Sequence, residues 1–175
     1  MSLTRADLRR LFELLNEQLR LKGVRGELFL VGGAVMCLAH DARASTQDVD
    51  AAFRPSAVIR EAAAAVAKQA GLDPRWLNDG VKGFMSDAGE FAPFLELDHL
   101  KVLIAQPAYL LAMKCMAMRL GAEFRDEDDV RFLLRLLDVH TYDEAISLIT
   151  KYYPLNQIPQ KTIYMLPELL PHPEQ

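Results

Sequence analysis

The sequence has little of the material from which disulfide frameworks, zinc sites and membrane spans are built. Its 175 residues include only two cysteines, Cys37 and Cys115, which lie far apart inside apolar stretches and are typical of reduced core residues. The longest nearly uninterrupted apolar run, residues 28–39, is too short to cross a bilayer and contains two glycines. Polar and charged residues follow Met1, so no signal peptide is expected. These features predict a cytoplasmic protein that has no membrane partner.

An excess of positive charge is also missing, which argues against a protein devoted to coating nucleic acid. The chain has 20 Lys and Arg against 24 Asp and Glu, for a formal net charge of −4. The one basic concentration lies on and just after the first expected helix. We interpret it as a solvated helix face, with RNA binding as the alternative. Its members are Arg5, Arg9, Arg10, Arg20, Lys22 and Arg25.

What is present is enough apolar material, 51% of residues, for a substantial core in one domain of 175 residues. The order of expected elements predicts an α+β fold with α/β-like features, in which helices back a small mixed sheet. We expect the core and an N-terminal helix in residues 1–105, and a helical C-terminal region in residues 106–175. The expected elements are helices at 4–22, 34–40, 55–71, 107–120, from 126 and at 142–152, and strands at 28–31, 48–53, 94–97 and 100–104. Thr4 and Asp7 resemble a capping box at the start of the first helix, and the last two strands resemble a hairpin that turns at Asp98 and His99.

Two other segments are expected to lack regular structure. Residues 73–89 contain Pro74 and three glycines, so we expect a long irregular connection. Within it, Trp76 either anchors the core or packs beside a nucleotide base. Five of the nine prolines lie in the last 22 residues, which predicts an extended tail broken by short turns.

The most informative pair of residues is Asp48 and Asp50. Residues i and i+2 of a strand project to the same face, whereas Val49, Ala51 and Phe53 point to the other. Two carboxylates side by side repel each other unless a cation lies between them. Hard oxygen ligands of this kind suit Mg²⁺, which completes its coordination with waters and substrate phosphates. For an isolated pair, an exposed strand face with two solvated aspartates is the simpler explanation.

Residues that can hold phosphate precede this pair. Gly32 and Gly33 interrupt the passage from an expected strand to an expected helix, where glycine lets a ligand approach the backbone and the helix start offers N–H groups. The spacing is neither a P-loop nor a dinucleotide fingerprint. Arg43 and Thr46, a cation and a hydroxyl, stand between the glycines and the aspartates. Each element alone is weak, but their order predicts a nucleotide site.

Together these residues resemble a signature of the nucleotidyltransferase superfamily. The matching stretches are Val31-Gly32-Gly33 and then Arg43-Ala44-Ser45-Thr46-Gln47-Asp48-Val49-Asp50. The resemblance is closest to the minimal bacterial branch that includes abortive-infection and toxin–antitoxin nucleotidyltransferases. Downstream, Lys114, Arg119 and the run Arg125-Asp126-Glu127-Asp128-Asp129-Val130 are similar to that branch's second motif. The resemblance covers residues 28–137.

This resemblance implies a minimal nucleotidyltransferase core and Mg²⁺-dependent transfer of a nucleoside monophosphate from an NTP such as ATP. Gly32 and Gly33 would cradle the triphosphate, with Arg43 and Thr46 on its phosphates. Asp48 and Asp50 would hold Mg²⁺. Lys114 would place phosphates, and Asp126 would orient or deprotonate the acceptor hydroxyl. The implied partners are the NTP, an RNA, protein or small-molecule acceptor, and a cognate antitoxin or other partner protein in a phage-defence system.

The downstream residues also allow simpler interpretations. Lys114 lies among apolar residues with no acid at i±3 or i±4, so its partner must come from elsewhere, unless its stem packs and its head reaches water. Asp126 is a good helix N-cap residue, and the acids after it complement the helix dipole.

One departure from the family pattern supports a second function. Many nucleotidyltransferases carry a third carboxylate on a later strand, but the expected strand at 100–104 has none, although Glu96 and Asp98 lie nearby. Either Asp126 substitutes for it, or activity is weak or lost. The alternative is therefore a catalytically inactive nucleotide-binding or partner-binding protein on the same fold. A purely structural domain is a third possibility.

Overall fold

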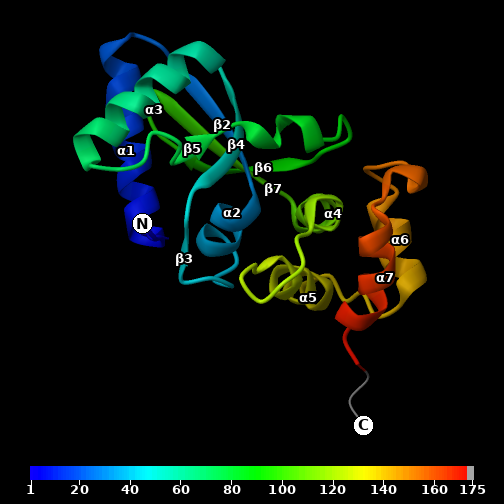
Figure 1. Ribbon diagram of the computed structural model, residues 1–175. Coiled ribbons are helices and arrows are strands. Elements are labelled where there is room, and N and C mark those ends of the chain that lie inside the picture. The colour runs from blue at the N-terminus through cyan, green and yellow to red at the C-terminus, as the bar shows by residue number, and fades with distance from the viewer. Residues whose placement is uncertain (173–175) are drawn as a thin grey trace. The chain divides into compact units, whose positions relative to one another are not determined.

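The computed structural model describes residues 1–172 and confirms the α+β fold class (Figure 1). The chain forms two compact units. The first comprises Met1–Gly83 and Phe91–Ala105, and the second comprises Phe84–Glu90 and the chain from Gln106 onward. The segment Phe84–Glu90 belongs to the second unit, although it precedes residue 106 in the sequence. Within residues 1–172, no helix is long and apolar enough to cross a membrane.

The first unit is built on a five-stranded mixed sheet in the order β5-β4-β2-β7-β6. The central strand β2 (Gly26–Val31) pairs antiparallel with β4 (Val49–Arg54) and parallel with β7 (Leu100–Ala105). The hairpin of β6 (Phe91–Glu96) with β7 confirms the turn expected at Asp98 and His99. A short strand, β5 (Leu77–Asn78), pairs parallel with the start of β4.

Two long helices pack against each other and on this sheet: α1 (Arg5–Leu21) and α3 (Ser56–Ala70) (Figure 1). The helix α1 begins with the expected capping box, in which the Thr4 side chain accepts from the Asp7 backbone and the Asp7 carboxylate accepts from Thr4. Its apolar positions are fully buried, as the helical spacing predicts. They are Leu8, Phe12, Leu15 and Leu19.

The segment that carries the candidate site lies between β2 and β4. The short helix α2 (Gly32–Leu38) follows β2 directly, with no residue between them. A two-residue strand, β3 (Ser45–Thr46), pairs antiparallel with β1 (Leu3–Thr4). This pairing fixes the backbone just before Asp48. Cys37 in α2 and Cys115 in the second unit are both free and buried, as expected of core thiols.

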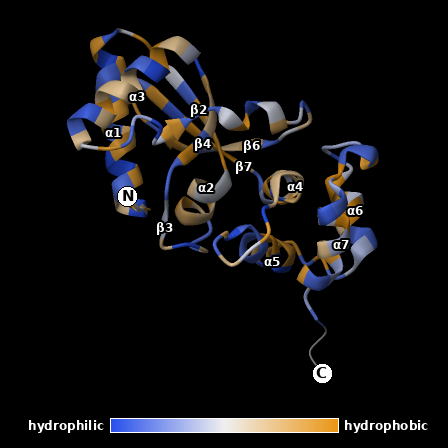
Figure 2. Cartoon of the chain, in the orientation of Figure 1, coloured by the Kyte–Doolittle hydropathy of each residue, from blue (hydrophilic) through white to orange (hydrophobic). Residues whose placement is uncertain are grey.

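The second unit is helical, as expected for the C-terminal region. Its helices have apolar faces turned inward, and Figure 2 shows the alternation of hydrophobic and hydrophilic residues along them. Burial raises the pKa of the Cys115 thiol to about 12, so this thiol stays protonated in the core. The elements are α4 (Pro107–Ala117), α5 (Asp126–Leu136), α6 (Tyr142–Ile149), the 3₁₀ turn η2 (Leu155–Gln157) and α7 (Gln160–Leu169).

The structure corrects two of the sequence expectations. The tail is not mainly extended, because α7 forms with Pro159 at its N-cap and tolerates Pro167 inside it. Pro173 lies outside the described residues. The connection at 73–89 is also less irregular than predicted, since it contains β5 and the 3₁₀ helix η1 (Gly80–Phe84). Both elements are too short to produce a hydrophobic period that a sequence pattern could reveal.

Candidate functional site

The two aspartates lie where the alternation of β4 predicts. Asp50 is the second residue of the strand and Asp48 immediately precedes it. Val49, Ala51 and Phe53 are buried, whereas both aspartates are half-exposed. The carboxylates therefore belong to the side of β4 that the core does not use, which leaves them accessible to a ligand.

Gly32 lies directly beside Asp50. Val31, the last residue of β2, is the register partner of Asp50, so the chain leaves β2 at the carboxylate. Gly32 has a φ of +69°, and a Cβ on it would lie 3.0 Å from Asp50 Oδ2. A side chain at this position would be strained by its backbone and crowded by the carboxylate. Both features explain why glycine is found there.

Gly33 lies against the cation and the hydroxyl predicted to hold phosphate. A Cβ on Gly33 would lie 2.8 Å from Arg43 Nη1 and 2.8 Å from Thr46 Oγ1. Thr46 is buried, and its hydroxyl donates to the backbone carbonyl of Asp48 at 3.1 Å. We call Gly32, Gly33, Arg43, Thr46 and Asp50 the glycine cradle, because they surround the start of α2.

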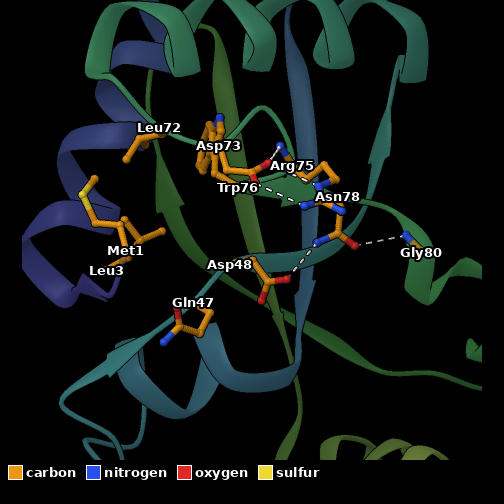
Figure 3. Close-up of a pocket in the computed structure, with 10 residues that line it drawn as sticks. All are labelled: Met1, Leu3, Gln47, Asp48, Leu72, Asp73, Arg75, Trp76, Asn78 and Gly80. Atoms are coloured by element: carbon orange, nitrogen blue, oxygen red, sulfur yellow. Dashed lines mark hydrogen bonds and ion pairs between the residues drawn. The ribbon is translucent and has the colours of Figure 1, made fainter.

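Asn78 is a site residue that the sequence interpretation missed. Its amide Nδ2 donates to Asp48 Oδ2 at 3.3 Å, and its Oδ1 accepts from the Gly80 backbone at 3.3 Å (Figure 3). The parallel pairing of β5 with β4 brings Asn78 to this position. Because both ends of the amide are engaged, it fixes the orientation of the Asp48 carboxylate. A two-residue strand gives no sequence signal for this contact.

Trp76, for which the sequence left two interpretations open, is a core anchor. Only 2% of its surface is exposed, and its indole Nε1 donates to the Ala63 carbonyl at 3.0 Å. An indole held in this way cannot stack on a base.

A cavity of about 570 Å³ adjoins Asp48 within the first unit. Figure 3 shows that its lining residues come from the N-terminal strand, from Gln47 and Asp48, and from the segment between α3 and η1. Leu3 and Leu72 contribute apolar surface, and Gln47 and Asn78 contribute amides. The Asp48 side chain thus borders the cavity, while its backbone carbonyl is bound to Thr46 of the glycine cradle.

The residues of this site fit a Mg²⁺ ion that a substrate helps to coordinate. Among residues 1–172, no group of three or more His, Cys, Asp and Glu side chains could hold a metal ion. Asp48 and Asp50 instead supply two carboxylates, and Gly32 keeps the space beside Asp50 free of a side chain. Because Mg²⁺ retains waters and binds phosphates, one or two carboxylates are sufficient when a nucleotide is present.

In the second unit, Lys114 is the centre of a buried ion-pair cluster. Its Nζ lies 2.6 Å from Asp129 Oδ2 and 3.3 Å from Asp126 Oδ1, and only 10% of its side chain is exposed. The interpretation of Lys114 as a lysine whose head reaches water is therefore wrong, and its partners come from α5. Arg119 Nε completes the cluster at 2.9 Å from Asp126 Oδ2.

The prediction that Asp126 caps α5 is also wrong. Arg125 occupies the N-cap position, and Asp126 is the first residue of the helix. Its carboxylate accepts instead from the Arg119 backbone N–H at 3.0 Å and from the Arg119 side chain. Burial would raise the pKa of Asp126, but the Arg119 hydrogen bonds and the Lys114 charge outweigh it and lower this pKa to about 2.

This depressed pKa predicts how the stability changes in acid. The ordinary pKa is 3.8, so Asp126 stabilises the folded state above that pH, and this contribution is lost as the pH falls through about 2. The loss is about 2 kcal/mol, because a difference of one between the ordinary pKa and the pKa in the folded state corresponds to about 1.4 kcal/mol. We expect the difference in unfolding free energy between the wild type and Asp126→Asn to shrink by this amount between about pH 5 and about pH 2. Urea unfolding at each pH measures it, and a constant difference would contradict the assignment.

The basic concentration near α1 is largely neutralised by acidic neighbours. Four of its six members form ion pairs, and Arg9 lies over the Phe94 ring at 5.5 Å. Paired cations release fewer counterions on binding RNA, so this arrangement favours the interpretation as a solvated face. RNA binding by this face stays a prediction. The ion pairs are Arg5–Asp41, Arg20–Glu17, Lys22–Glu61 and Arg25–Glu96.

Comparison with known proteins identifies no relative: no family model matches the chain, and neither a curated protein nor a solved structure matches it.

Proposed function

We propose that this chain is a Mg²⁺-dependent nucleotidyltransferase that moves a nucleoside monophosphate from an NTP to an acceptor. The observation that carries the proposal is the glycine cradle, in which Gly32 lies against the Asp50 carboxylate and the adjacent Gly33 against the Arg43 guanidinium and the buried Thr46 hydroxyl. These residues lie apart in the sequence and come together at one point of the first unit. A solvated strand face does not account for that convergence.

Each residue has a distinct task in this proposal. Gly33 lets the β- and γ-phosphates approach the backbone, where Arg43 offsets their charge, while the Thr46 hydroxyl holds the Asp48 backbone in place beside them. Asp48 and Asp50 would hold the Mg²⁺, which when bound polarises the phosphate oxygens and offsets charge on the leaving pyrophosphate. Asn78 keeps Asp48 oriented. Catalysis of this kind depends on positioning and electrostatic stabilisation.

The proposal rests on the first unit alone. The catalytic roles predicted for Lys114 and Asp126 stay predictions, because the ion pairs by themselves explain why both residues are charged and buried. A carboxylate with a pKa of about 2 is also a weak base, so deprotonation of the acceptor by Asp126 is unfavourable in this state.

A second candidate function is nucleotide binding without turnover. It is favoured by β7, which lies beside β2 and carries Lys101, Val102, Leu103 and Ile104 where many nucleotidyltransferases place a third carboxylate. Such a protein would use the same glycine cradle but act through a partner, such as a cognate antitoxin. The acceptor of an active enzyme stays open among RNA, protein and small molecules.

The deciding experiment measures NTP binding and turnover of the whole chain. We expect calorimetry to show NTP binding that requires Mg²⁺ and is lost with EDTA, and release of pyrophosphate when labelled NTPs are incubated with cellular RNA and protein. Metal-dependent binding without transfer would select the second candidate. If no NTP binds at millimolar concentration with Mg²⁺ present, both candidates are wrong.

A further inference from the structure

We propose that the cavity beside Asp48 binds the nucleoside of the NTP, the base and the ribose. This inference rests on the proposed function and adds to it a site for the part of the substrate that the glycine cradle does not hold. The cavity lies within the first unit and is lined from three segments of the chain (Figure 3). Its volume of about 570 Å³ is in the range of small-molecule sites.

The position of the cavity follows from the order of groups in an NTP. The α-phosphate is the group attacked, so it must lie at the metal held by Asp48 and Asp50. The β- and γ-phosphates then extend to Gly33 and Arg43 at the glycine cradle. The nucleoside leaves the α-phosphate by its 5′-oxygen and needs a concave surface next to the same carboxylates. The cavity that Asp48 borders is such a surface.

The lining has apolar and polar parts, as a nucleoside does, and it also carries the Asp73–Arg75 ion pair. Leu3 and Leu72 offer apolar surface, which suits the face of a base, and Gln47 offers an exposed amide. Since an amide carries both donors and an acceptor, Gln47 can rotate to suit the edge of any base. The Asn78 amide is engaged with Asp48 and Gly80 and cannot do so. We therefore expect this site to bind all four NTPs with similar affinity.

The test compares ATP with inorganic tripolyphosphate, which has the phosphates but no nucleoside. Calorimetry is done with Mg²⁺ on the whole chain and on four variants. Leu72→Trp fills the cavity and Gln47→Ala removes its exposed amide. We expect both to weaken ATP binding, Leu72→Trp by about tenfold or more, and to change tripolyphosphate binding by less than about twofold.

Two further variants are controls. Gly33→Ala, which crowds the glycine cradle, should weaken the binding of both ATP and tripolyphosphate. Gln69→Ala removes an exposed amide from α3, away from the cavity, and should change neither.

Each remaining outcome overturns the inference. If both cavity variants leave ATP binding unchanged, or weaken ATP and tripolyphosphate equally, no nucleoside lies there. If they bind ATP normally but lose transfer, the cavity holds the acceptor instead. If the wild type binds tripolyphosphate but gains nothing from the nucleoside of ATP, the inference fails while the phosphate site stands. If it binds neither ligand, the proposed function fails and the inference falls with it.

Discussion

Asp48→Asn and Asp50→Asn should each reduce Mg²⁺-dependent nucleotidyl transfer by about 100-fold or more, the usual scale for removing one electrostatic contributor from an active site. Each amide keeps the shape of the carboxylate but removes a formal charge that the metal needs. The two changes have different surroundings. Asp48 accepts a hydrogen bond from Asn78, which the amide oxygen of the Asn variant can still accept, whereas Asp50 faces Gly32. NTP affinity with Mg²⁺, pyrophosphate release and thermal unfolding measure the effects.

The stability of these two variants separates a metal site from a structural role. Both aspartates are half-exposed, so their neutralisation should leave the melting temperature unchanged or slightly raised, since it relieves repulsion between neighbouring carboxylates. Asp98→Asn is the matched control, because Asp98 is exposed in the β6–β7 turn of the same unit. It should change neither activity nor stability. Full metal-dependent activity in both site variants would contradict the assignment of the metal pair.

Local patterns predicted those parts of the fold whose cause is local. The capping box at Thr4, the alternation along β4 and the β6–β7 hairpin each depend on residues a few positions apart. The prediction of an extended tail was wrong because it considered only the local effect of proline. Proline was taken to break helices, but Pro159 precedes α7 and Pro167 lies within it, where the buried residues Thr162, Leu166 and Leu169 stabilise the helix by packing.

In the candidate site, too, local features were predicted from the sequence and long-range contacts were not. The sequence gives the order of Gly33, Arg43 and Thr46 but not their distance, which depends on how β3 and β4 return past α2. The contact of Asn78 with Asp48 was not predicted, because a strand of two residues is too short to show a hydrophobic period in the sequence. The partner of Lys114 was predicted only to be distant in sequence, since the packing of α4 against α5, rather than spacing along one helix, brings Asp126 and Asp129 to it.

The largest change in stability is expected for Lys114→Met. Asp126 and Asp129 have side chains only 5% and 3% exposed, and Lys114 is bound to both. Removing the lysine takes its ion pairs away from two buried carboxylates, although Asp126 keeps its ion pair with Arg119. Loss of one partner of a buried ion pair costs about 3–5 kcal/mol, which is a large part of the stability of a domain this size.

Urea unfolding at neutral pH measures the free energy of unfolding of this variant. Lys161→Met, on the exposed face of α7, is the matched control and should lie within about 0.5 kcal/mol of the wild type.

A double variant distinguishes the cost of a buried charge that has lost its lysine from the cost of lost packing. If the cost of Lys114→Met comes from the carboxylates left behind, Lys114→Met combined with Asp129→Leu should recover much of the lost stability, because buried ion pairs replaced by apolar side chains are often neutral. The pair should therefore be strongly non-additive. A double variant that is as unstable as the sum of both single variants would show that the lysine stem, rather than its charge, holds α4 against α5. NTP binding by the first unit should survive in the double variant, because none of the glycine cradle residues belongs to this cluster.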